Sequence, residues 1–194
     1  MTAVAYCTPD EVKAYNRLNI TTAEDDGTLA QIIDAVSLRI DEMHNLPAGG
    51  YAVSADTTRY YQYSDIASNG RLFLDAPCLS VTTLTNGDST TIPSNGYRLH
   101  PRNEECKWFI ELLSTYAWGI TTDGEISVVG KFGHSTTPPA TIVEAAAMWA
   151  GSILKRYQAA LQDATVNVEL GQLIYSAPIP SQVIALLRPS GAML

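Results

Sequence analysis

The sequence is poor in charged residues, and basic residues are the scarcer kind. Only 16% of its 194 residues are charged, and 12 Lys and Arg stand against 20 Asp and Glu, for a net charge of −8. An average soluble domain has roughly a quarter of its residues charged. So low a charge density leaves surface that can be buried against partners, which favours a self-associating protein, although a monomer rich in Ser and Thr would have the same composition.

A basic patch is also missing, because basic residues outnumber acidic ones in no part of the chain. Residues 1–56 hold three basic and nine acidic residues, residues 57–133 hold six and eight, and residues 134–194 hold three of each. No segment could neutralise several phosphates, which argues against direct nucleic-acid binding. An acidic surface repels DNA and is useful only where DNA must slide past it.

Cysteine is rare, and its spacing carries no motif. Cys7, Cys78 and Cys106 are far apart, and no CxxC pair occurs. This pattern indicates neither a zinc site nor a disulfide framework. We expect buried free thiols, as in a reducing cytoplasm.

Signals for export or membrane insertion are absent from the sequence pattern. The first basic residue is Lys13, so the start lacks the charged region of a signal peptide. The longest apolar run, residues 142–154, contains Glu144 and Ser152. It is too short and too interrupted to span a membrane, so we expect no membrane partner.

Catalytic and metal-binding motifs are missing as well. His44, His100 and His134 lie one in each region of the chain, without a second His or Cys at ligand spacing. The patterns GxSxG and HExxH do not occur. Residues 130–135 lack the spacing of a phosphate loop, and we interpret them as a strand end followed by an exposed loop. We therefore expect no enzymatic activity, no cofactor and no metal.

Two helices are predicted near the beginning. Thr8 can cap the first, Pro9 suits its first position, and Glu11 completes a capping box. Its short apolar face is formed by Val12, Tyr15 and Leu18. The second starts at residues 24–26 and continues with apolar residues at helical spacing to Met43, ending before residues 47–50.

The period of the pattern changes to two between residues 57 and 133. Strands are predicted at 59–63, 71–74, 79–85, 90–92, 97–99, 108–112 and 125–129, with a hairpin turn at Asn86-Gly87. They predict an antiparallel meander or small sandwich. Alternation places Tyr61 and Tyr63 on one face and Tyr60 on the other. Ordinary sheet packing is favoured for these tyrosines over a stacking or sugar-binding face.

The last third returns to helix. Residues 140–161 carry apolar groups around most of a helix, which predicts a central helix covered by other elements or by neighbouring subunits. A strand-like stretch follows at 166–175, and a last short helix lies between Pro180 and Pro189. We thus expect one α+β domain. It comprises N-terminal helices (1–56), an inserted antiparallel β-region (57–135), a long helix (136–163) and a C-terminal segment (164–194).

The order of several short segments carries a resemblance. TPDEVKAY at 8–15 and DDGTLAQII at 25–33 come first, followed by FLDAPCLSV at 73–81, where a strand pair meets at a proline. GYRLHP at 96–101, ISVVGKFG at 126–133, PATIVEAA at 139–146 and IPSQVIALLRP at 179–189 complete the series. In this order and spacing they resemble the head-to-tail connector (adaptor) family of tailed bacteriophages, also found in gene transfer agents. One departure is the lack of an aromatic residue after Arg188.

The resemblance implies a structural virion protein at the neck, made in the host cytoplasm. It implies a ring of about twelve copies beneath the portal protein, closed by rotation. Such a ring extends the DNA channel, lets DNA pass without specific binding, and carries a stopper, a tail terminator or another tail protein. It also implies that the C-terminal segment docks on the portal, through Ile179, Val183, Leu186, Leu187 and Arg188.

Three alternatives stay open at this stage. Another neck or tail-completion protein would usually be smaller and mostly β. A carbohydrate- or peptide-binding module could use the tyrosine-rich strand. An enzyme would need a cleft with two converging titratable groups.

Overall fold

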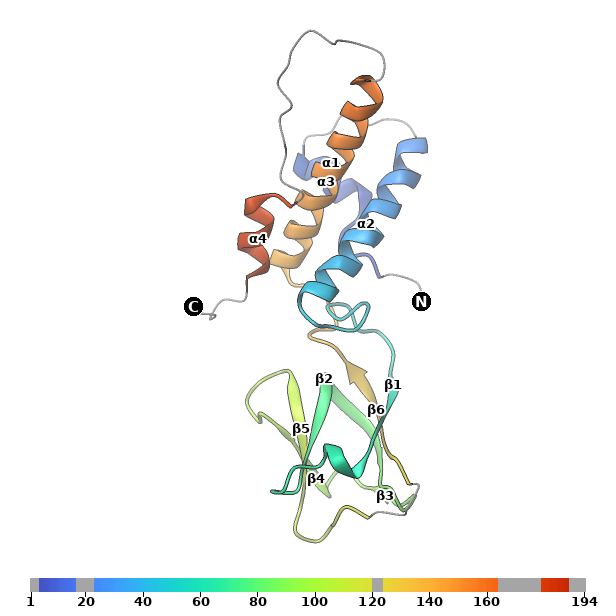
Figure 1. The fold of residues 1–194 in the computed structure, drawn as a ribbon, viewed down its shortest axis with the longest axis vertical. Helices are drawn as coiled ribbons and strands as arrows, with labels where there is room; N and C mark the ends of the chain where they lie inside the picture. The colour runs from blue at the N-terminus through green and yellow to red at the C-terminus, as the bar shows by residue number, and fades with distance from the viewer. Residues whose placement is uncertain (1–3, 17–22, 120–123, 164–178, 189–194) are drawn as a thin grey trace. The chain divides into compact units, whose positions relative to one another are not determined.

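The computed structural model describes residues 4–16, 23–119, 124–163 and 179–188. The chain forms two compact units, in agreement with the predicted α+β class. One, here the helical unit, combines Met1–His44 with Pro138–Leu194, and the other, the sheet unit, is Asn45–Thr137 (Figure 1). Since the sheet unit lies between two helices in the sequence, it is an insertion into the helical unit.

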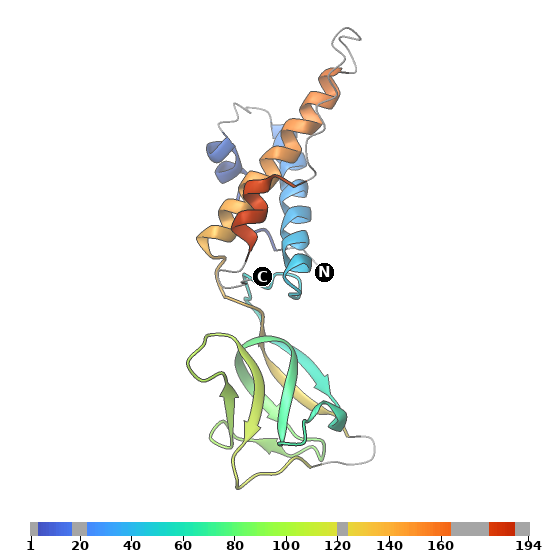
Figure 2. The ribbon, with the colours of Figure 1, turned by 60° about the vertical axis from the view of Figure 1, so that its left-hand side comes forward.

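The helical unit is organised around α3 (Ala140–Asp163), which contacts the other three helices. These are α1 (Pro9–Asn16), α2 (Ala23–Met43) and α4 (Ser181–Leu187). The prediction of a central helix is therefore confirmed. Figures 1 and 2 both show α4 running alongside α3. The strand-like stretch predicted at 166–175 and the stop at Pro189 lie outside the described residues.

The start of α1 follows the predicted capping box. The Thr8 amide donates to Glu11 Oε2 at 2.7 Å, and the Glu11 amide donates to Thr8 Oγ1 at 3.2 Å. These two bonds satisfy donors that a helix N-terminus otherwise leaves unpaired. The third residue of the predicted apolar face, Leu18, lies outside the described residues.

Apolar side chains at helical spacing form the core of the helical unit. On α2 the buried positions include Leu29, Ile33, Val36 and Ile40; on α3 they include Ile142, Ala145, Ala146, Trp149 and Leu154. Most of the predicted apolar stripe is thus confirmed. Met43 and Tyr157 are exceptions, with 42% and 49% exposed. Each belongs to a helical face that the described residues leave uncovered.

The sheet unit is one antiparallel sheet of six strands. The strands are β1 (Thr57–Tyr61), β2 (Arg71–Thr85), β3 (Thr91–Ile92), β4 (Tyr97–His100), β5 (Lys107–Leu112) and β6 (Ile126–Phe132). Their order is β1-β6-β2-β5-β4, and β3 pairs with β2, as expected from the hairpin turn predicted at Asn86-Gly87. Because β6 lies between β1 and β2, the finer prediction of a meander or sandwich is not confirmed.

All six strands contribute to a single core. It contains Tyr61, Leu72, Leu74, Ala76, Cys78, Leu84, Ile92, Tyr97, Ile110, Ile126, Val128 and Phe132. Within the described part of this unit the only helical element is a three-residue 3-10 turn, Tyr63–Asp65. A sheet without a covering helix can bury one face by curving around it, and Figure 2 shows this curvature.

β2 is one continuous strand, whereas the sequence predicted two strands separated at Pro77. A proline cannot donate to a strand ladder. The pairing of β2 with β5 shifts its register between Phe73 and Cys78, so the ladder needs no donor at Pro77. The carbonyl oxygen of Pro77 still accepts from the Gly133 amide at 2.7 Å.

The chain enters and leaves the sheet unit through neighbouring segments. The amide of Val53 donates to the Ser135 carbonyl at 3.0 Å, and the amide of His134 donates to the Gly50 carbonyl at 2.6 Å. The Ser135 hydroxyl also donates to the Tyr51 carbonyl at 2.9 Å. The two ends of the insertion are therefore hydrogen-bonded to each other.

Candidate functional site

The five residues that the resemblance assigns to portal docking occupy two different environments on and around α4. Val183 is fully buried and Leu187 is 4% exposed, so both are covered by this chain itself. Ile179 and Leu186 are half-buried, and Arg188 is exposed. Only the last three can reach another molecule without a rearrangement of the helical unit.

Helix α4 is held in place from two sides. It packs on α3, and its buried side chains are Val183 and Leu187. The imidazole Nε2 of His44, just after α2, lies 2.8 Å from the Leu187 carbonyl oxygen. On the outer side, Ile184 is 38% exposed and lies one turn before Arg188, a pairing that the sequence analysis did not identify. The exposed surface of α4 is mixed, because Ser181, Gln182 and Ala185 are exposed beside Ile184, and a cation lies at its end.

A groove runs between α1 and α3. It has a volume of about 740 Å³ and is lined by Glu11, Ala14, Tyr15, Pro138, Ala140, Val143 and Glu144. We call it the α1–α3 groove. The Tyr15 hydroxyl donates to Glu144 Oε1 at 2.9 Å, and this bond raises the pKa of Tyr15. The lining holds two carboxylates and no basic residue, so the groove is apolar and acidic.

Sequence reasoning did not find this groove, because its two walls are more than a hundred residues apart. Its carboxylates already have partners within the chain. Glu11 Oε2 accepts from the Thr8 amide and hydroxyl, and Glu144 accepts from Tyr15. The groove has no histidine or cysteine in its lining. Its composition suits the binding of an apolar group next to a cation.

The outer face of the sheet unit carries an aromatic row across β2, β5 and β4. Register places Phe73 opposite Phe109, and Phe109 opposite His100. The Phe73 and Phe109 rings are 5.5 Å apart, and the His100 ring stacks on Phe109 at 4.9 Å with an angle of 2°. Phe73 is 49% exposed. An exposed phenylalanine on a strand is available for burial against a partner.

Charged residues form the next row of the same face. Arg71 and Arg98 lie opposite Glu111 from its two sides, and the Arg71 guanidinium lies 4.8 Å from the centre of the Phe109 ring. His100 Nε2 lies 3.0 Å from Glu111 Oε2. We call these six residues, Arg71, Phe73, Arg98, His100, Phe109 and Glu111, the outer-face patch. With two arginines and one glutamate, it is positively charged on an acidic protein.

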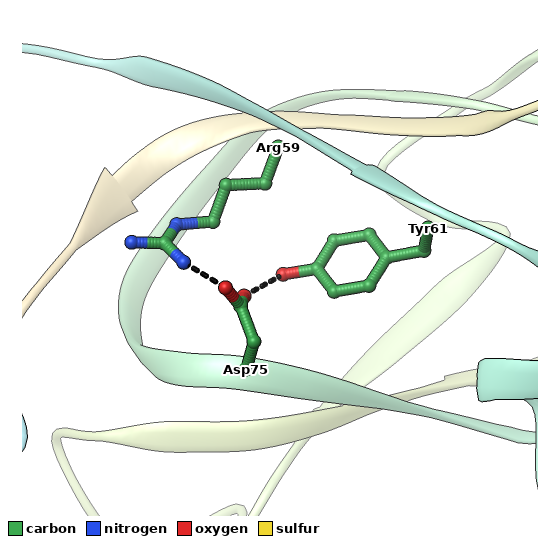
Figure 3. A network of polar contacts seen from close by, with 3 residues as sticks. All are labelled: Arg59, Tyr61 and Asp75. Atoms are coloured by element: carbon green, nitrogen blue, oxygen red, sulfur yellow. Dashed lines mark hydrogen bonds and ion pairs between the residues drawn. The ribbon is translucent and has the colours of Figure 1, made fainter.

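A polar network ties β1 to β2. Figure 3 shows the Asp75 carboxylate between the Arg59 guanidinium and the Tyr61 hydroxyl, which donates to Asp75 Oδ1 at 2.7 Å. The guanidinium also lies 4.8 Å from the centre of the Phe132 ring. Burial and the bond to Asp75 raise the pKa of Tyr61. The network stabilises the sheet and leaves Tyr61 unavailable to a ligand.

The predicted grouping of the tyrosines is therefore wrong. Tyr61 is buried, while Tyr60 is 65% and Tyr63 is 59% exposed. Tyr63 does not continue β1, because the Asp65 carboxylate accepts from the Gln62 amide at 2.8 Å and starts a 3-10 turn. The alternation that placed Tyr61 and Tyr63 on one face is lost at this turn.

The remaining candidates for chemistry are separated. His44 and His100 have the contacts given above, and the His134 ring lies 5.1 Å from that of Tyr51. In residues 4–16, 23–119, 124–163 and 179–188, no three His, Cys, Asp or Glu side chains gather as a metal site requires. The helices described in these ranges include none that is long and apolar enough to cross a membrane.

Comparison with known proteins gives a result at the level of fold. No protein-family model and no curated protein matches the chain. A chain in the neck of an empty gene transfer agent (GTA) particle, computed with C6 symmetry, is similar over 96% of this chain and 92% of its own, with 19% identity and a TM-score of 0.55.

Two further chains of known structure are similar to this one to the same extent. One belongs to the virion of a native gene transfer agent particle, with 18% identity, coverage of 96% and 90%, and a TM-score of 0.57. The other belongs to the neck of a native GTA particle computed with C12 symmetry, with 18% identity, coverage of 96% and 91%, and a TM-score of 0.55. The likeness covers nearly the full length of each chain, so both the helices and the inserted sheet have counterparts there.

Proposed function

We propose that this protein is a structural component of the neck of a tailed phage-like particle, located between head and tail. The observation that carries the proposal is the likeness of its fold, over 96% of the chain, to chains of gene transfer agent particles, two of them in the neck. The combination of a four-helix unit with an inserted curved sheet is specific enough to make such coverage informative.

The finer proposal is that of an adaptor, a ring of about twelve copies beneath the portal protein. The solved necks were computed with C6 and C12 symmetry, which supports a ring. A ring of identical subunits needs two different surfaces on each copy that fit each other. The net charge of −8 would let DNA move through the lumen without sticking to the wall.

Within this proposal the C-terminal helix contacts the portal. Ile179, Leu186 and Arg188 are accessible and would make direct contacts, together with Ile184. Val183 and Leu187 would act indirectly, since they hold α4 against α3. The outer end of the ring would carry the stopper, the tail terminator or another tail protein. Such a role requires binding and rigidity, and no catalytic step.

The test is to locate the chain in the particles whose genome encodes it. An epitope-tagged full-length chain is expressed from its own locus, and particles are purified on a density gradient. We expect the chain to co-purify with the particles and gold-labelled antibody to mark the junction of head and tail. We also expect deletion of the gene to give DNA-filled heads without tails.

Two outcomes would contradict the proposal. The chain could be absent from purified particles, or the deletion could leave complete particles in normal numbers. A label on the capsid surface or on tail fibres would reject the neck position while keeping a structural role. The adaptor assignment requires in addition that the tagged chain co-precipitates the portal protein from a lysate of a tail-deficient strain.

A further inference from the structure

Two surfaces of the chain have complementary chemistry. The outer-face patch is aromatic and positively charged, and the α1–α3 groove is apolar and acidic. The patch belongs to the sheet unit and the groove belongs to the helical unit. Two different surfaces that fit each other are what a head-to-tail contact between identical subunits requires.

We propose that the outer-face patch of one copy docks into the α1–α3 groove of the next copy. Phe73 enters the groove, and Arg98 pairs with Glu144. This inference deepens the proposed neck function, and rests on it for the expectation that copies of the chain meet one another. The occupant of the groove is thus a second copy of this protein.

The size and lining of the groove suit an aromatic side chain. The groove is broad and open to solvent, and its volume of about 740 Å³ leaves room for an aromatic ring. The walls at Ala14, Ala140 and Val143 are small and apolar. Phe73 is held by the ring of Phe109 and still exposes 49% of its surface. Burial of that surface on docking removes a large apolar area from water.

The choice of the charged pair follows from what each group already does. Arg71 lies over the Phe109 ring, whereas Arg98 is exposed on the edge strand β4. Glu11 caps helix α1, whereas Glu144 accepts from the Tyr15 hydroxyl through Oε1. Arg98 and Glu144 can therefore form a new pair without breaking an element of the fold.

The charge of the helical unit also suits it as the partner of the patch. The helical unit carries six basic and eleven acidic residues, counted over 1–44 and 138–194. A positive patch with exposed aromatic surface is attracted to that unit in each neighbour. Aromatic residues and arginine are enriched at the centres of protein interfaces, which is the composition of the patch.

The experiment traps the contact with engineered disulfides in the purified full-length chain. Cys106→Ser is present in every variant to remove the half-exposed native thiol. Glu111→Cys, which lies in the patch and leaves Phe73 and Arg98 in place, combined with Val143→Cys in one chain should give a ladder of dimers, trimers and larger species on mild oxidation. The control pairs Val143→Cys with Tyr60→Cys, an aromatic position on β1 that is 65% exposed, and should give no ladder.

Mixing distinguishes a head-to-tail contact from a symmetric one. The protein with Glu111→Cys alone and the protein with Val143→Cys alone should each stay monomeric, and their mixture should stop at a dimer. Arg98→Glu or Glu144→Arg in the double-cysteine chain should each reduce the ladder at least tenfold. The two charge reversals together should restore it, because the pair is then re-formed with opposite signs.

The proposal is overturned by any of three results. The double-cysteine chain could give no ladder, the Tyr60 control could give an equal one, or the charge reversals could fail to change it. These results are independent of the particle experiment. A chain found at the neck without a ladder would keep the neck function and reject this contact. A ladder from a chain that is missing from particles would keep the contact and reject the neck function.

Discussion

Replacement of Leu187 by alanine should release helix α4 from the helical unit. The change removes three carbon groups from a side chain that is 4% exposed. At about 0.8 kcal/mol for each buried group, the lost transfer free energy is about 2.4 kcal/mol. Any cavity that remains adds to this loss, and measured Leu→Ala substitutions in cores cost about 2–5 kcal/mol. We expect the lower part of that range, because a seven-residue helix can shift to fill part of the space.

Ile184→Ala is the matched control on the same helix. It also removes three carbon groups, but from a side chain that is 38% exposed. Alanine is also the better helix former, by a few tenths of a kcal/mol, which offsets part of the loss. The loss of stability should stay below about 1 kcal/mol. If the proposed docking is correct, Ile184→Ala should instead weaken binding of the portal protein.

Hydrogen–deuterium exchange of the peptide that spans α4 measures this difference directly. A loss of 2.4 kcal/mol corresponds to exchange that is about 50-fold faster, since about 1.4 kcal/mol is a factor of ten. The Ile184→Ala protein should exchange within about fivefold of wild type. Equal acceleration in both variants, or a larger effect of Ile184→Ala, would show that α4 does not rest on α3 through Leu187.

The sheet unit offers three smaller tests. Gly130→Ala should destabilise it by about 1–3 kcal/mol, measured by hydrogen exchange, because an added Cβ would lie 2.2 Å from the Ser80 carbonyl oxygen. Tyr61→Phe should cost about 0.5–1.5 kcal/mol in urea unfolding, since Asp75 loses one donor. Burial raises the pKa of Cys78 from 9.0 to about 11. Burial of the neutral Cys78 thiol should therefore stabilise the fold fully below about pH 9 and less toward about pH 11. Cys78→Ala should reduce this decline without abolishing it, because burial also raises the pKa of Cys7 to about 12.

Local signals predicted the helices well. The capping box of Thr8 and Glu11 is present in both directions, and the apolar spacing of α2 buries Leu29 and Ile33 as expected. Such signals work because their partners lie within one or two turns. The same reasoning missed the α1–α3 groove, whose Tyr15 and Glu144 are 129 residues apart.

The strands were found, but apart from the hairpin of β2 and β3 their pairing was not. Period-two alternation identifies which face of a strand is buried, and says nothing of which strand lies beside it. The position of β6 between β1 and β2 and the register shift at Pro77 depend on contacts across the sheet. The outer-face patch needs that register, because Phe73, Phe109 and His100 become neighbours only once β2, β5 and β4 are aligned.

The portal-docking residues show a third limit of prediction from the sequence. A resemblance assigns a segment, and burial then divides the segment into residues that support it and residues that can touch a partner. Val183 and Leu187 belong to the first group, and Arg188 belongs to the second. Ile184 was missed, although a helix that exposes Arg188 also exposes the residue one turn before it.

The hydrogen bonds that join the two ends of the insertion have a consequence for protein engineering. Val53 is hydrogen-bonded to Ser135, and Gly50 is hydrogen-bonded to His134, so the two ends of the inserted segment are held together at its base. A segment of this kind can be excised as a cassette or exchanged for that of a distant relative without a change in the spacing of its host. Chimeras cut at this base would exchange the sheet unit, with its outer-face patch, while keeping the helical unit unchanged.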